Sequence, residues 1–374
     1  MLRRSIVLGS LLAASAIAGL GFTRASVGVT AGMTTGAAGL QSVGPLALGP
    51  SGVLFAGDSK GAAIYALALG DNGAAAAPAQ LTDVGAKIAA LLGVTRRDIV
   101  VNDMVANPRS GVVYFSIARG KGPDAQPAIV RVAPDGALQQ IRLDSVTFSK
   151  LDLEGAPRAD QPFVHPAWSN AKRRDYSVTA LNFSDGELYV SGVTNEEFAS
   201  SLRRVAFPFD GRSSVTKVSM YHTAHGMYET EAPIASFLPV TLGGQKMILA
   251  GYLCTPLATF PLKGLTAGGT LRGSTVIELG SGNGPRDIAT FERSGEQYVV
   301  VATGRGWMAR VSAKQLASAP ALSTPVDARA GVPFVTPELK GVREIEPLAN
   351  SSFLILQLAA DSTLSMRIVD NSVF

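Results

Sequence analysis

The amino-acid sequence predicts an all-β protein folded as a six-bladed β-propeller. Of the 374 residues, 47% are hydrophobic and 17% are charged, which is typical of a globular protein and excludes a disordered or collagen-like chain. Two β-rich runs joined by a short Gly or Ser turn recur six times along the sequence. Because these runs are apolar on both faces, each predicted sheet must pack against neighbours, and a closed ring of six sheets satisfies all of them.

The six copies can be followed through the residue at the centre of each turn. Successive turns lie between about 50 and 75 residues apart, which leaves room for one four-stranded blade in each interval. The turn residues are Gly52, Gly111, Gly186, Gly244, Gly295 and Ser351. A seven-bladed ring is the alternative if the longest interval, from Gly111 to Gly186, contains an extra blade. The segment 143–175 within this interval looks too irregular for that.

The end of the chain predicts how the ring closes. After Ser351 the sequence is long enough for two strands but not for a complete four-stranded blade. We therefore expect the mature N-terminal segment, around 27–41, to supply the outermost strand of the sixth blade. This strand would close the ring by joining both ends of the chain in one sheet.

One short helical insertion is predicted at 83–92, between the first and second blades. Its apolar residues fall on one helical face, and they are Val84, Ile88, Leu91 and Leu92. Thr82 or Asp83 provides an N-cap, and Gly93 follows the predicted end of the helix.

Residues 1–25 have the features of a signal peptide. Arg3 and Arg4 precede an uncharged, mostly apolar run at 6–20, and small residues suited to cleavage follow. The arginine pair fits either a Sec signal or a twin-arginine signal. We expect residues 26–374 to form a single β-propeller domain that is periplasmic or secreted. No later segment has about 18 consecutive apolar residues, so no membrane insertion is expected after cleavage.

The charge and cysteine content exclude several classes of protein. With 33 basic and 29 acidic residues, the net charge of +4 is too small for the electrostatic footprint of a nucleic-acid-binding protein. A single cysteine cannot form an internal disulfide. Cys254 ends an apolar run that is typical of a strand, and we interpret it as a buried structural thiol. A metal ligand or a nucleophile is the alternative.

Charged residues and all three histidines are concentrated in the segments that lead into the innermost strand of each blade. In a propeller these segments lie on one face of the ring, beside the central channel, and loops on a rigid scaffold commonly carry function. We therefore predict a polar site at one mouth of the channel. Its candidate channel-lining or ligand-binding residues are Asn102, Asp103, Arg174, Asn283, Arg286, Asp287 and Arg343.

The densest group of candidate metal ligands comes before the fourth copy of the repeat. His222 and His225 are followed by Glu229 and Glu231, and imidazole with carboxylate suits a divalent metal ion. Zinc, copper and calcium are the candidate metals. His165 lies between prolines in a long connection, where it either anchors the loop or supplies a third imidazole. A solvated, internally hydrogen-bonded polar loop is the alternative to metal binding.

The segment 44–58 is similar to the repeats of gluconolactonase-like and NHL-repeat β-propellers. This resemblance implies a six-bladed propeller, and gluconolactonase-like enzymes hold a divalent metal with a Glu, two Asn and an Asp. Asn-Asp-Met at 102–104 resembles one Asn-containing motif of that family, and 285–288 resembles the motif that carries the Asp. Gly44 stands where the family has its Glu, and 177–179 replace its Ser-Asn-Gly, so two of the four ligands are missing.

These observations support two alternative functions. The first is an exported propeller with a divalent-metal site, acting as a metal-dependent hydrolase on a small ester, lactone or sugar-derived substrate through a metal-activated water. The second is a non-enzymatic scaffold that binds a protein or carbohydrate partner on its rim. The sequence contains no motif of α/β-hydrolases, P-loop proteins or strand-linked dinucleotide-binding loops.

Overall fold

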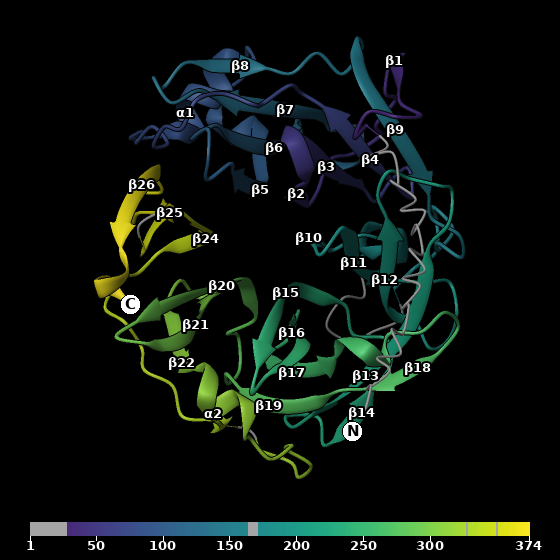
Figure 1. Cartoon of the computed structure of the whole chain (residues 1–374), viewed down its shortest axis with the longest axis vertical. Helices are drawn as coiled ribbons and strands as arrows, with labels where there is room; N and C mark the ends of the chain where they lie inside the picture. The colour runs from purple at the N-terminus through teal and green to yellow at the C-terminus, as the bar shows by residue number, and fades with distance from the viewer. Residues whose placement is uncertain (1–27, 164–170, 327, 349–350) are drawn as a thin grey trace, which may run out of the picture.

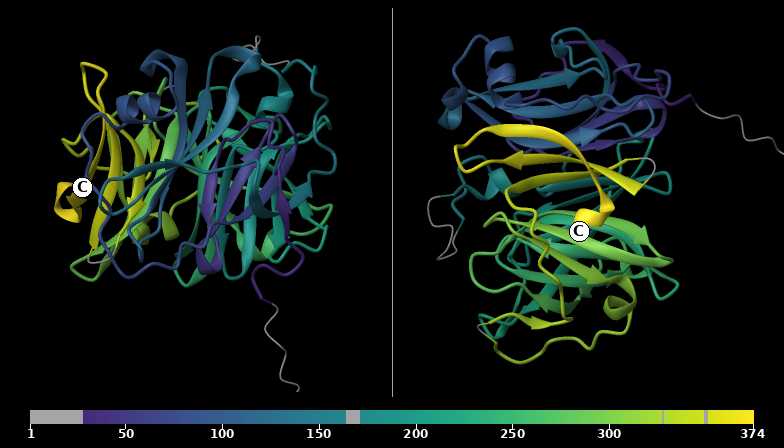
Figure 2. Two further views of the ribbon diagram at one scale, coloured as in Figure 1. Left: turned by 90° about the horizontal axis from the view of Figure 1, so that it is seen from above. Right: turned by 90° about the vertical axis from the view of Figure 1, so that its left-hand side faces the viewer.

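The computed structural model of the chain describes residues 28–163, 171–326, 328–348 and 351–374. In these residues the strands form six sheets arranged as a ring, seen face-on in Figure 1. Figure 2 shows the same sheets from two sides, with their strands crossing the thickness of the ring. The predicted six-bladed β-propeller is confirmed, and the seven-bladed alternative is not supported.

The strands of the first three sheets follow from the first three copies of the repeat. The first sheet contains β1 (Thr34–Gly36), β2 (Leu46–Leu48), β3 (Val53–Asp58), β4 (Ala63–Ala68) and β9 (Val146–Asp152). The second contains β5 (Ile99–Ala106), β6 (Val113–Arg119), β7 (Gln126–Val132) and β8 (Leu138–Gln140). The third contains β10 (Ala180–Ser184), β11 (Glu187–Val193), β12 (Ser200–Ala206), β13 (Ser214–His222) and β14 (Met227–Glu229), and β18 (Thr270–Arg272) pairs with β13 in parallel.

The last three copies of the repeat form the remaining sheets. The fourth sheet contains β15 (Ile234–Leu242), β16 (Gln245–Tyr252), β17 (Pro256–Pro261), β19 (Ser274–Glu278) and β23 (Ala330–Gly331). The fifth contains β20 (Pro285–Arg293), β21 (Glu296–Thr303) and β22 (Met308–Ser312). The sixth contains β24 (Val342–Pro347), β25 (Ser352–Leu358) and β26 (Leu364–Asp370).

The first hairpin of each sheet turns at the residue that the sequence pattern singles out. The five turn glycines have φ between +71° and +80°, a left-handed conformation that glycine adopts without steric cost. Ser351 takes the same place in the sixth sheet, with φ of +59°. The repeat therefore marks the tight turn between the innermost strand and the second strand of every blade.

The sheets do not follow one another around the ring in chain order. The innermost strands neighbour one another in the order β5, β2, β10, β15, β20 and β24, and β24 lies beside β5 again. After β4 the chain builds the second sheet on one side of the first and then returns as β9, which pairs with β4 (Figure 1). The third sheet begins on the other side. The first sheet thus lies between the second and the third, and the sixth sheet meets the second.

Ring closure differs from the sequence-based expectation. β1 lies in the N-terminal segment 27–41, but it pairs with β9 at the outer edge of the first sheet. The outer edge of β26 is bridged by Leu81, whose backbone exchanges two hydrogen bonds with Met366. The expectation that the N-terminal strand closes the ring on the sixth blade is wrong. The returning strand β9 offers that segment a nearer free edge, and the connection after β4 covers the sixth sheet instead.

Six hydrophobic clusters hold the ring together, and each of them lies between two neighbouring sheets. Leu54 and Tyr114 join the first sheet to the second, for example, while Phe55 and Val190 join the first sheet to the third. Close-packed interfaces of this kind keep the innermost strands in fixed positions around the channel.

Helix α1 (Val84–Leu91) confirms the predicted insertion. The Asp83 carboxylate caps it by accepting a hydrogen bond from the Ala86 N–H. Ile88 is fully buried between the second and sixth sheets, and Figure 2 shows the helix beside the sixth sheet. Leu91 is 40% exposed, so it does not belong to the buried face that the sequence predicted.

A second helix, α2 (Ala313–Ala317), follows β22 directly and is capped by the Ser312 hydroxyl group. Among the helices of the described segments, none combines the length and the apolar character needed to cross a membrane.

Candidate functional site

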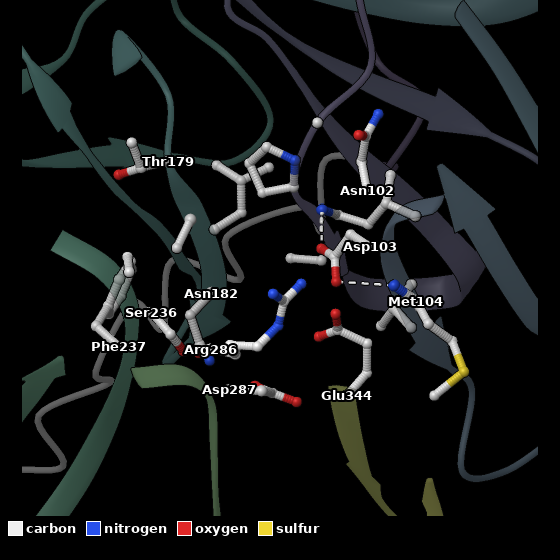
Figure 3. A pocket seen from close by; sticks show the side chains of 18 of the residues that line it. Asn102, Asp103, Met104, Thr179, Asn182, Ser236, Phe237, Arg286, Asp287 and Glu344 are labelled. Carbon is white, nitrogen blue, oxygen red and sulfur yellow. Dashed lines mark hydrogen bonds between the residues drawn. The ribbon is translucent and has the colours of Figure 1, made fainter. Parts of the chain in front are cut away.

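A cavity of about 950 Å³ occupies the central channel. Residues from the innermost strands β2, β5, β10, β15, β20 and β24 line it, so all six sheets contribute to its wall. Figure 3 shows a close view of its polar side. A cavity of this size accommodates a small molecule of the dimensions that enzymes commonly bind.

Carboxyl groups from three innermost strands face this cavity. Asp103 of β5, Asp287 of β20 and Glu344 of β24 each follow a shift in strand register, and Glu346 lies two residues further along β24. A β-bulge re-aims the side chains next to it. The same irregularity in three strands therefore brings three carboxyl groups to equivalent positions around the channel.

Asp103 and Asp287 tie neighbouring strands together. Asp103 accepts a hydrogen bond from the backbone N–H of Leu46 on β2, at 2.7 Å, and Asp287 accepts one from Ile345 on β24, at 2.6 Å. The second oxygen of each carboxylate accepts from the N–H of the following residue in its own strand. These two side chains thus stabilise the inner wall of the ring as well as facing the cavity.

Glu344 is different, because none of the described residues forms a hydrogen bond or a close ion pair with its carboxyl group. Figure 3 shows the side chains of Asp103, Arg286 and Glu344 directed toward one another in the cavity. The Glu344 carboxyl group is therefore available to a bound molecule.

The cavity raises the pKa of its carboxyl groups. Burial raises the pKa of Asp103 to about 7, against the hydrogen bond from Leu46, and the nearby Asp287 adds to the rise. Burial also raises the pKa of Asp287 to about 6. Burial and then the charges of Asp103 and Asp287 raise the pKa of Glu344 well above its usual value, and the pKa of Glu346 is raised in the same way. Near neutral pH the cavity therefore holds protonated and ionised carboxyl groups together.

The structure brings only some of the predicted channel residues to this cavity. Asn102, Asp103, Arg286 and Asp287 line it, and the Asn102 amide donates a hydrogen bond to the Val43 carbonyl oxygen at 2.8 Å. The other three predicted residues lie elsewhere, and they are Arg174, Asn283 and Arg343.

Each of these three residues has a different position. Arg343 lines a second cavity of about 260 Å³, whose wall also includes Arg286 and Glu344. Asn283 is buried and accepts a hydrogen bond from the Trp307 indole N–H at 2.6 Å, which anchors the turn before β20. Arg174 lies in a short 3-10 helix beside the cavity, but it is not one of the residues that line it.

His222 and His225 belong to a second cluster, and neither of them lines the channel cavity. His222 ends β13, and its Nδ1 atom donates a hydrogen bond to Glu229 Oε1 at 2.8 Å. His225 bonds through Nδ1 to the same oxygen. Cys254, from the turn between β16 and β17, completes a group of three potential metal ligands with the two histidines. The described candidate residues therefore fall into two separate clusters, whereas the sequence-based expectation was one shared site at the channel mouth.

The remaining predicted metal ligands are Glu229, Glu231 and His165. Glu229 contacts both imidazoles, whereas Glu231 does not belong to the group of potential ligands among the described residues. His165 lies outside the described residues. Cys254 is partly exposed, so the interpretation as a buried structural thiol does not describe its surroundings.

Electrostatics couple the groups of this second cluster. Burial by itself lowers the pKa of His222, but hydrogen bonds to Cys254 and Glu229 outweigh it and raise the pKa to about 10. Burial opposes the ionisation of Glu229, yet its bonds to the two histidines hold its pKa below the usual value. In the absence of another cation, the cluster is thus arranged as a carboxylate paired with a protonated imidazole.

Glu344 and Glu346 were not among the predicted site residues, and metal binding by Cys254 was only the alternative interpretation. A signal for Glu344 is present, since Arg343-Glu344 repeats the polar-acidic pairs at 102–103 and 286–287 in the same position of the blade. No comparable local signal marks Cys254, because its neighbours in sequence are those of an ordinary strand.

Comparison with known proteins adds a limited similarity. No family model matches the sequence, and no curated protein matches it. Among solved structures, virginiamycin B lyase from Staphylococcus aureus is similar at 10% identity and a TM-score of 0.35, covering 89% of this chain and 98% of that one.

Two further solved structures, both with dehydrogenase in their names, show similarity of the same order. The PQQ-bound aldose sugar dehydrogenase from Streptomyces coelicolor has 12% identity and a TM-score of 0.30, covering 90% of this chain and 97% of that one. A putative oxidoreductase (glucose dehydrogenase) from Thermus thermophilus has 14% identity and a TM-score of 0.31, covering 90% of this chain and 100% of that one. At these values the names of the similar proteins say nothing about the activity of this chain.

Proposed function

We propose that the protein is an exported β-propeller that binds a small polar molecule in its channel cavity and hydrolyses it by acid/base catalysis. The substrate class is a small ester, lactone or sugar derivative. The observation that carries the proposal is the Glu344 carboxyl group, which faces the cavity without a hydrogen-bond partner among the described residues and has a strongly raised pKa. A protonated carboxyl group of this kind is a general acid at neutral pH.

A complementary base is present in the same cavity. With a pKa of about 6, Asp287 is mostly ionised at neutral pH. In the proposed reaction a water molecule adds to the electrophilic carbon, and its proton passes to Asp287. The bond to the leaving oxygen breaks, and this oxygen takes the proton of Glu344. Arg286 supplies a positive charge beside these groups that stabilises negative charge on a substrate oxygen.

This proposal places the reaction away from the histidines. His222 and His225 do not line the channel cavity, so a water activated by a metal on these residues would not meet a substrate bound there. Carboxyl groups are therefore the catalysts that we propose for the cavity. The export part of the proposal is supported by Arg3-Arg4 and the apolar run at 6–20.

The proposal is tested with the full chain expressed in a host that exports it. N-terminal sequencing of the exported product checks cleavage near Ala25, and the product is then assayed against a panel of small esters, lactones and glycosides. We expect Glu344→Gln to lower kcat/KM by about 10² to 10⁴-fold on the active substrate. The matched control is Glu338→Gln, which changes an exposed glutamate in the segment before β24 and is expected to retain activity.

A second measurement separates catalysis from folding. Difference infrared spectroscopy between the wild type and Glu344→Gln should show the carbonyl stretch of a protonated carboxyl group at pH 7. If the panel gives no turnover and no ligand shifts the melting temperature, the enzymatic proposal fails and a scaffold for a protein or carbohydrate partner is favoured. Equal activity of Glu344→Gln and wild type would also overturn the role of Glu344.

A further inference from the structure

We propose that His222, His225 and Cys254 form a zinc site that joins the third and fourth sheets at the outer part of the ring. This site is separate from the channel cavity, and the inference does not depend on the proposed hydrolysis. It also differs from the ligand set that the sequence predicted, since a thiolate takes the place of the two glutamates.

The ligands converge from parts of the chain that only the fold brings together. His222 and His225 lie in and next to the hairpin of β13 and β14, and Cys254 lies in the turn between β16 and β17. One ring nitrogen of each histidine and the Cys254 Sγ atom all lie within 4.8 Å of one another. The centroids of the two imidazole rings are 4.0 Å apart. Small movements of these side chains would bring all three donors to bonding distance from one ion.

The surrounding side chains hold the ligands in position. Glu229 bonds to Nδ1 of both imidazoles, as carboxylates do when they orient metal-binding histidines from the outer shell. Thr223 donates a hydrogen bond at 2.7 Å to Glu278, whose other oxygen accepts the Gly280 N–H at 3.1 Å. The loop after His222 is thereby tied to the end of β19. Such supporting contacts reduce the reorganisation that metal binding requires.

The donor set indicates the kind of metal. Two imidazole nitrogens and one thiolate suit zinc, whereas calcium prefers a larger set of oxygen ligands. His222 is fully buried, but the His225 side chain is 41% exposed and Cys254 is partly exposed. An ion can therefore enter from the surface. Three protein ligands leave the fourth tetrahedral position to water or to an added ligand.

A zinc ion bound here would cross-link two neighbouring blades. The β13–β14 hairpin belongs to the third sheet, and the β16–β17 turn belongs to the fourth. Because the ion binds the folded protein and not the separated segments, its binding stabilises this interface by mass action. The expected result is a melting temperature that rises with zinc concentration.

The experiment uses the full-length protein, treated with chelator and then titrated with Zn²⁺ or Co²⁺. We expect one ion per chain, an increase in melting temperature, and protection of Cys254 from alkylation. Co²⁺ should give the thiolate-to-metal charge-transfer band of a tetrahedral site. Cys254→Ser removes this band, and Glu229→Gln weakens zinc binding by about 10 to 100-fold.

Two further variants separate the loss of a metal ligand from a loss of folding. His225→Gln changes an exposed side chain, so it should abolish binding without unfolding the protein. Glu231→Gln is the matched control, because Glu231 is close in sequence but outside the ligand group, and it should bind zinc like the wild type.

Four outcomes overturn the proposal. These are binding of less than one ion per chain, an unchanged Co²⁺ spectrum in Cys254→Ser, equal effects of Glu229→Gln and Glu231→Gln, and tight binding of Cu⁺ with no measurable Zn²⁺ binding. Hydrolysis by the channel groups should persist after metal removal, so the two proposals fail independently.

Discussion

Replacement of Asp103 by Asn tests the electrostatics of the channel in a quantitative way. Asp103 has a folded-state pKa of about 7, against an ordinary value of 3.8. Its protonated form is favoured in the folded protein, so this group makes the protein less stable as the pH rises. The free energy of unfolding begins to fall above the pKa of Asp103 in the unfolded chain, near 4, and this decrease is complete above pH 7.

The size of the effect follows from the difference in pKa. A difference of about 3 pKa units corresponds to about 4 kcal/mol of unfolding free energy, of which about 3 kcal/mol falls between pH 5 and pH 8. Asn does not ionise, so Asp103→Asn removes this pH dependence. The Asn amide also loses one acceptor for the N–H groups of Leu46 and Met104, which costs about 1 to 3 kcal/mol at every pH and cancels when the two pH values are compared.

The measurement is urea unfolding, followed by circular dichroism, at pH 5 and pH 8. Relative to wild type, Asp103→Asn should gain about 3 kcal/mol of unfolding free energy on going from pH 5 to pH 8. The control is Asp160→Asn, since the Asp160 side chain is 86% exposed and its substitution should leave the pH dependence of the wild type unchanged. If Asp103→Asn shifts stability equally at both pH values, Asp103 does not carry a raised pKa and the account of the cavity is refuted.

Two further predictions concern the ring. Leu81→Pro removes the N–H that bonds to the Met366 carbonyl oxygen. We expect the free energy of unfolding to fall by about 1 to 3 kcal/mol and hydrogen exchange at β26 to become faster. Unchanged exchange at β26 would show that Leu81 does not close the sixth sheet. Gly192→Ala places a Cβ atom 2.1 Å from the Ser177 carbonyl oxygen. We expect it to destabilise the protein by about 1 to 3 kcal/mol or more, measured by thermal unfolding. The control is Gly36→Ala, whose Cβ atom meets no atom within 4 Å. Equal melting temperatures of these two glycine variants would contradict the close approach.

The sequence predicted those features that depend on neighbouring residues. The hairpin turns at Gly52 and its five counterparts were recognisable because each needs a left-handed residue between two apolar runs. Helix α1 was recognisable because Asp83 caps a short stretch with a buried face. Counting these local units gives the number of blades, since each hairpin begins one sheet.

The candidate site was predictable only in part. Asp103 and Asp287 stood out as acidic residues before innermost strands, and the structure brings both to the channel cavity. Glu344 was not singled out, although Arg343-Glu344 repeats the pairs at 102–103 and 286–287. Only the fold shows that Glu344 faces a cavity that strands from the other five sheets also line. Its raised pKa arises from burial and from the charges of Asp103 and Asp287, which are distant in the chain.

The amino-acid sequence by itself thus determined the first hairpin of each blade, its turn, the short helix and the number of blades, because these follow from periodicity and turn chemistry within a few residues. Only the tertiary structure decided that the first sheet lies between the second and third, and that Leu81 covers β26 in place of the N-terminal strand. It also decided that Cys254 meets the histidines while those histidines lie apart from the channel. The physical reason is that a free strand edge pairs with whichever segment reaches it, and residue spacing along the chain does not encode that choice.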